Sequence, residues 1–168
     1  LLGKPTHKAR ELAFRHMSTL YALDPANPIF RALRRLWALE ESAQPLLALA
    51  VALARDPLLR GTQAFFLEQP CGVTVPREAV ETFLNATHPD RFSPASLKSF
   101  AQNVAGTWTA AGVLHGRLRK TRTVAARHPE SIAMLLFLSY LEGRSGQRLF
   151  TSDWLNLLES SSHELEAL

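Results

Sequence analysis

The chain has 168 residues, with 19 basic and 15 acidic side chains and a formal net charge of +4. This length suits one domain or two small ones. The 46% share of hydrophobic residues excludes an intrinsically disordered protein. The single cysteine excludes an internal disulfide framework and a multi-cysteine zinc site. These features predict a folded protein of the reducing cytoplasm.

Residues 1–70 have the pattern of a helical bundle. Apolar residues recur at helical spacing, and the segments between them contain capping residues and proline. The predicted helices span residues 6–22, 29–41, 46–54 and 56–66, with Thr6 capping the first and Asp56 capping the last, before Pro57. The third of these helices is apolar on all sides, so we expect it at the centre of the bundle.

Residues 71–168 are predicted to form a second unit, which begins after the break at Pro70 and Gly72. Its expected elements are a helix after Pro76, a longer helix over 94–111 capped by Ser93, a basic hairpin that turns at His115 and Gly116, a helix over 131–141 and a last helix near 151–158. The predicted class is therefore mainly α, with at most a small β-hairpin. A helix, a turn, a second helix and then a basic hairpin is the order of a winged helix-turn-helix.

The excess positive charge is confined to part of this second unit. Residues 1–90 carry ten basic and nine acidic side chains, and residues 129–168 carry two basic and six acidic ones. The intervening residues 91–128 contain no acid and seven basic side chains: Arg91, Lys98, Arg117, Arg119, Lys120, Arg122 and Arg127. A segment of this kind attracts phosphates and repels none.

The predicted helix over 94–111 has two different faces. One is an apolar stripe suited to burial: Leu97, Ala101, Val104, Trp108 and Ala111. The other is small and polar: Ser99, Gln102, Asn103 and Gly106. Short side chains let a helix approach the base edges of a major groove, and Gln and Asn can pair with adenine through two hydrogen bonds. We expect this face to meet the groove, and the following residues to contact phosphates: Lys98, Arg117, Arg119, Lys120 and Arg122.

Catalytic and membrane functions have little support in the sequence. The six histidines show no ligand spacing for a helical metal site, no Gly-rich phosphate loop is present, and Cys71 has no neighbouring base, so we interpret it as structural. No cofactor, no metal and no enzymatic activity are predicted. The longest apolar runs, 46–54 and 133–138, are too short to span a bilayer.

Two further groups of residues have predicted structural roles. The three tryptophans, Trp37, Trp108 and Trp154, each fall on an apolar stripe and are expected in the core. The cluster of Arg31, Arg34 and Arg35 is expected to pair with Glu40 and Glu41 on the same helix.

The C-terminal half resembles the BrxA family, the small accessory proteins of BREX bacteriophage-exclusion systems. The residues that carry the resemblance are the run SFAQNVAGTWTAAGVL over 99–114, the basic stretch 116–122, the segment 132–143 and Leu149 with Phe150. The resemblance covers roughly residues 76–158. It implies a helical cytoplasmic protein with helix-turn-helix modules that binds DNA and serves a multi-protein defence system.

The sequence thus predicts a non-catalytic protein that binds double-stranded DNA, as an accessory component of a bacterial phage-defence system or a regulatory assembly. RNA in place of DNA stays open, as does a homodimer. The alternative is a helical adaptor that acts through protein–protein contacts. In that case the basic segment would meet an acidic partner, such as the acidic tail of another copy.

Overall fold

The computed structural model describes residues 3–159 and is mainly helical, as predicted, with one small antiparallel sheet. The elements in chain order are α1 (His7–Leu20), α2 (Pro28–Trp37), the 3₁₀ turn η1 (Glu41–Ala43), α3 (Gln44–Arg55), α4 (Pro57–Gly61), α5 (Gln63–Leu67), α6 (Arg77–Thr87), α7 (Pro94–Ala110), β1 (Leu114–His115), β2 (Thr121–Arg122), α8 (Pro129–Leu141), η2 (Gly146–Leu149) and η3 (Leu155–Leu158).

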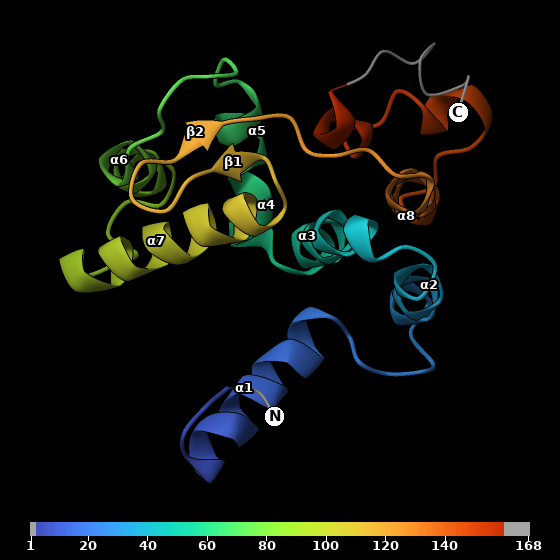
Figure 1. The fold of residues 1–168 in the computed structure, drawn as a ribbon, viewed down its shortest axis with the longest axis horizontal. Coiled ribbons are helices and arrows are strands. Elements are labelled where there is room, and N and C mark those ends of the chain that lie inside the picture. The colour runs from blue at the N-terminus through green and yellow to red at the C-terminus, as the bar shows by residue number, and fades with distance from the viewer. Residues whose placement is uncertain (1–2, 160–168) are drawn as a thin grey trace.

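Helix α3 occupies the middle of the molecule, as its all-round apolar sequence predicts. It contacts α2 and α8 on one side and α4 and α7 on the other (Figure 1). Helices α6 and α7 and the two strands form one end of the molecule, α2 and α8 lie on the other side of α3, and α1 projects away below α3 (Figure 1). Within residues 3–159, no helix has both the length and the apolar character needed to cross a membrane.

A continuous cluster of buried side chains includes residues from both predicted units, among them Leu47, Trp108 and Leu135. The domain boundary near residue 70 stays a prediction. The core positions of Trp108 and Trp154 are confirmed, since both side chains are buried. The prediction for Trp37 is wrong: it is 39% exposed and lines an open groove with Met17 and Tyr21 of the α1 region.

Helix α1 begins where its cap predicts but packs less than its apolar stripe suggests. The Thr6 hydroxyl accepts a hydrogen bond from the Ala9 amide at 3.2 Å. No residue of this helix is buried, and Leu12 is 52% exposed. Sequence periodicity identified the helix, but whether another helix covers its apolar face is a tertiary property.

The predicted pairing of the α2 arginines is wrong. Helix α2 ends at Trp37, so Glu40 and Glu41 do not lie on the same helix as Arg31, Arg34 and Arg35. The Glu40 carboxylate instead accepts hydrogen bonds from the Ser42 amide and hydroxyl. None of the three arginines makes an ion pair with a described residue.

Two other helices differ from their predicted bounds. The segment 56–66 is divided into α4 and α5 at Thr62, whose hydroxyl donates to the Leu59 carbonyl at 2.7 Å and accepts from the Trp108 indole at 3.0 Å. The predicted last helix is only the 3₁₀ turn η3. Residues 160–168, which include Glu164 and Glu166 of the acidic tail, lie outside the described part of the chain.

Candidate nucleic-acid interface

Helix α7 has the two faces that its sequence predicts. Ser93 caps it by accepting a hydrogen bond from the Ser96 amide at 3.3 Å. Its apolar side is buried at Ala101, Val104 and Trp108. The predicted groove-facing residues lie on the other side: Ser99, Gln102 and Asn103 are exposed, and Gly106 is half-buried. The helix therefore presents a row of small polar groups to solvent.

Two aromatic contacts hold this helix, one with α5 and one with the residues just before the helix begins. Trp108 lies 5.1 Å from Phe66, measured between ring centroids, and its indole is hydrogen-bonded to Thr62. Near the other end, Phe100 stacks on Phe92 at 5.2 Å. Helix α6 packs against α7, and α7 runs across it (Figure 1). The exposed face is consequently held on a rigid support.

The strands after α7 form a sheet with the segment before α6. Leu114 pairs with Arg122, and His115 with Thr121. Thr74 forms an antiparallel bridge to Thr121, and the Val75 amide donates to the Lys120 carbonyl at 2.8 Å. Sequence analysis missed this third pairing, because Thr74 lies 47 positions before its partner and no local pattern links them.

The β1–β2 loop (residues 116–120) depends on Gly116. Its φ of +104° lies in the region that favours glycine. A Cβ atom at this position would lie 2.1 Å from the Arg119 carbonyl oxygen. The Lys120 ammonium donates to the Thr109 hydroxyl of α7 at 2.8 Å, which ties the loop to the helix. The loop is therefore constrained at both ends.

The loop and α7 enclose a groove of about 390 Å³. Gln102 and Ala105 line it from the helix, and Arg117, Leu118 and Lys120 line it from the loop. Arg117 and Arg119 are exposed, Lys120 is half-buried, and Lys98 is exposed on α7. Fold and sequence together therefore bring the polar face and four of the five predicted phosphate contacts to one part of the molecule.

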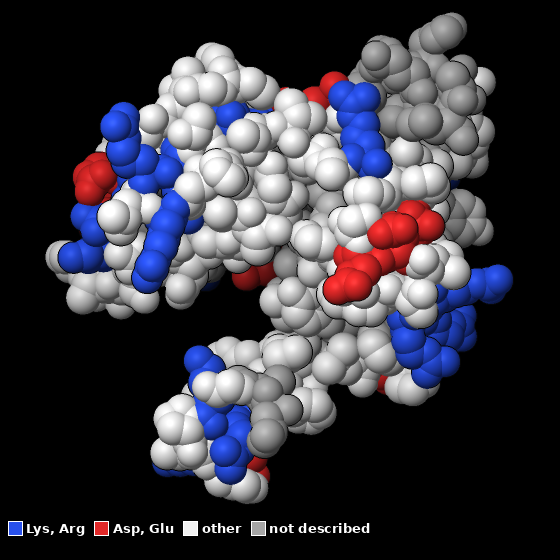
Figure 2. All heavy atoms as spheres, in the orientation of Figure 1, with Lys and Arg blue, Asp and Glu red and all other residues white. Residues whose placement is uncertain are grey.

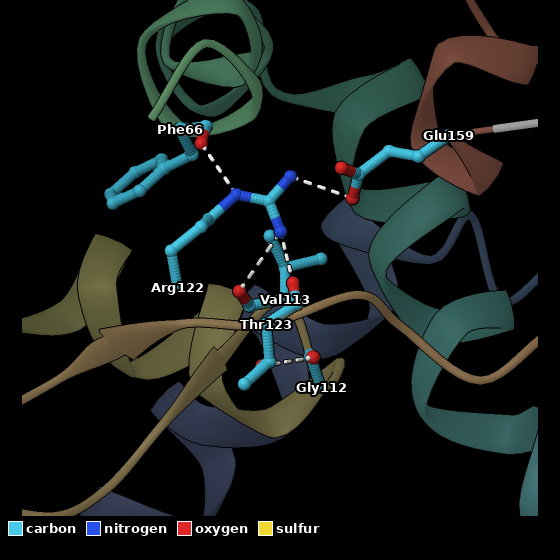
Figure 3. Close-up of polar contacts among 6 residues, drawn as sticks. All are labelled: Phe66, Gly112, Val113, Arg122, Thr123 and Glu159. Carbon is cyan, nitrogen blue, oxygen red and sulfur yellow. Dashed lines mark hydrogen bonds and ion pairs between the residues drawn. The ribbon is translucent and has the colours of Figure 1, made fainter. Parts of the chain in front are cut away.

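The structure contradicts the fifth predicted phosphate contact. The Arg122 side chain is fully buried (Figure 3). Its guanidinium and Nε donate to the carbonyls of Phe66, Val113 and Thr123, and Nη2 lies 2.6 Å from a Glu159 carboxylate oxygen. The hairpin register gives the reason: Arg122 faces the buried Leu114 across the strands and so points to the interior.

Basic side chains gather at the end of the molecule formed by α6, α7 and the β1–β2 loop, on the left in Figure 2. A small acidic patch lies among them (Figure 2). Arg77 of α6 lines the groove and is paired with two carboxylates, Glu78 at 2.7 Å and Glu81 at 2.6 Å. These acids are partly neutralised by their own arginine, so the free charge of this end comes from the loop and α7.

Other candidate sites have no such arrangement. Cys71, interpreted as structural from the sequence, is exposed in the turn after Pro70 and belongs to no core. Among residues 3–159, no group of His, Cys, Asp and Glu side chains is placed to hold a metal ion. No family model, curated protein or solved structure matches this chain.

Proposed function

We propose that the protein is a non-catalytic DNA-binding protein of the cytoplasm and that residues 72–122 act as a winged helix-turn-helix. The order of elements supports this proposal: a strand segment at Thr74, then α6, α7, β1 and β2, with the first segment paired to the last strand. In this assignment α7 is the recognition helix and the β1–β2 loop is the wing.

One observation carries the proposal: Gln102 from the polar face of α7 lines the same groove as the loop cations Arg117 and Lys120. A major groove about 12 Å wide admits one helix. With α7 seated there, Ser99, Gln102, Asn103 and Gly106 would approach the base edges. Lys98, Arg117, Arg119 and Lys120 would contact the flanking phosphates.

The decisive experiment compares two triple variants that remove the same charge. Replacing Arg117, Arg119 and Lys120 with alanine removes three cations from the loop, and replacing Arg31, Arg34 and Arg35 with alanine removes three from α2. Duplex affinity is measured by titration at several salt concentrations. In a plot of log binding constant against log salt concentration, the negative slope of the loop variant should be shallower than that of the wild type by about 2.7. Each lost phosphate contact contributes about 0.9 to the size of this slope.

The α2 variant should retain the wild-type slope. Equal losses in both variants would mean that affinity follows net charge alone and would overturn the assigned interface. A competition with duplex RNA separates the two nucleic acids, because the deep, narrow major groove of A-form RNA does not admit a helix. A place in phage defence is part of the proposal but rests on the sequence resemblance to the BrxA family alone.

An adaptor role is the second candidate, and a specific feature favours it. An apolar groove of about 370 Å³ lies between α1, α2 and α3 and is lined by Met17, Tyr21, Leu23, Phe30 and Trp37. Apolar surface of this kind marks protein–protein contacts. Under this alternative, Trp37→Ala would abolish self-association or partner binding, measured by analytical ultracentrifugation, and would leave duplex affinity unchanged.

A further inference from the structure

Leu118 is the most exposed large apolar side chain among the described residues. It is 96% exposed, and the next in order, Leu39, is 64% exposed. Burying a leucine side chain stabilises a folded protein by about 1.5–3 kcal/mol. A leucine that is almost wholly exposed to water does not contribute this stabilisation. The side chain occupies the tip of the β1–β2 loop, between the exposed Arg117 and Arg119.

The loop holds this tip in a defined position. The turn at Gly116 places its backbone close to the Arg119 carbonyl. Lys120 is held by two hydrogen bonds: its carbonyl accepts from the Val75 amide, and its ammonium donates to the Thr109 hydroxyl. Neither Arg117 nor Arg119 makes an ion pair with a described residue. The tip therefore presents an apolar side chain between two free cations.

We propose that this tip enters the DNA minor groove beside α7, with Leu118 inserted against a base step and the two arginines on either side of it. The inference rests on the proposed function and adds to it a mode of contact and a DNA distortion. The negative potential of the minor groove attracts arginine side chains. Apolar side chains that enter minor grooves partly unstack a base step and kink the duplex.

The mechanism predicts which duplexes are preferred. Unstacking costs least at pyrimidine–purine steps such as TpA, whereas A-tracts resist it. A protein with an apolar wedge therefore favours DNA that carries a flexible step at the position of the wing, even though Leu118 forms no hydrogen bond with a base. A protein partner with an acidic, apolar pocket is the competing occupant of the tip.

The test uses two short duplexes of equal base composition, one with a TpA step in each helical turn and one with uninterrupted A-tracts. A 2-aminopurine at the step reports unstacking, and dyes at the two ends report bending. Wild-type protein should favour the TpA duplex on the order of tenfold and raise the 2-aminopurine fluorescence on binding. Leu118→Ala should lose this preference, the fluorescence rise and the bend, but keep the wild-type salt slope.

Leu39→Ala is the matched control, since it removes another exposed leucine far from the loop, and it should behave as wild type. If Leu118→Ala binds and bends DNA like wild type, the proposed insertion of Leu118 is wrong, but the proposed DNA-binding function is unaffected. If the wild-type protein binds neither duplex, the proposed function fails and this inference fails with it. Because Leu118 is 96% exposed, its replacement by alanine should leave the fold intact.

Discussion

The Arg122 guanidinium and the Glu159 carboxylate lie 2.6 Å apart, with the arginine side chain fully buried and the glutamate side chain 25% exposed. Thirty-seven positions separate them in the chain. The pair joins strand β2, at the base of the β1–β2 loop, to the end of the segment that contains η3 (Figure 3). Arg122 of the basic segment thus stabilises the fold, whereas Arg117 and Arg119 of the same segment are exposed to solvent.

Removing this arginine should destabilise the protein strongly. Arg122→Ala leaves Glu159 and the Phe66 carbonyl without their partner, and breaking a buried ion pair costs about 3–5 kcal/mol. Chemical denaturation measures the free energy of unfolding. Arg119→Ala, an exposed arginine three positions earlier, is the control and should change it by less than about 0.5 kcal/mol. Similar values for the two variants would contradict the structural role of Arg122.

Gly116→Ala should disrupt the β1–β2 loop. The added Cβ would lie 2.1 Å from the Arg119 carbonyl oxygen, and the positive φ adds strain of about 1–3 kcal/mol. We expect a lower melting temperature and weaker duplex binding. Gly61→Ala is the control, because nothing lies within 4 Å of a Cβ at Gly61. A loop that tolerates alanine at position 116 with unchanged DNA affinity would show that its shape is unimportant for binding.

Gly106→Ala should separate stability from binding. Nothing lies within 4 Å of a Cβ at Gly106, and alanine is favoured over glycine inside a helix by about 0.5–1 kcal/mol. The variant should therefore be more stable in thermal denaturation. Its duplex affinity should fall, because the proposed interface needs a close approach of the α7 backbone to DNA. Unchanged affinity in the stabilised variant would remove Gly106 from the interface.

The carboxyl group of Glu40 should titrate below its ordinary range. Hydrogen bonds from the Ser42 hydroxyl and amide lower the pKa of Glu40. They favour the ionised form, so their contribution to folding is present above the unfolded pKa and is lost as pH falls through the lowered folded pKa. Ser42→Ala should raise the pKa of Glu40 in an NMR titration, whereas Ser42→Thr, which keeps the hydroxyl, should leave it low. An unchanged value in the alanine variant would assign the shift to other groups.

Much of the fold could be predicted from local sequence because its determinants are local. Thr6, Ser93 and Asp56 each satisfy backbone amides within the next three residues, so their capping roles follow from residue type and position. The two faces of α7 follow from helical periodicity. The polar and basic composition of the candidate interface is likewise a property of adjacent residues.

Only the tertiary structure decided which of these residues reach solvent. Arg117 and Arg122 have the same side chain and belong to the same basic segment, but β-strand register turns Arg122 toward Leu114 and the core. Trp37 and Leu12 have the periodicity of core residues, yet they are 39% and 52% exposed. Burial and long-range pairing depend on chain segments far apart in sequence, and local pattern does not encode them.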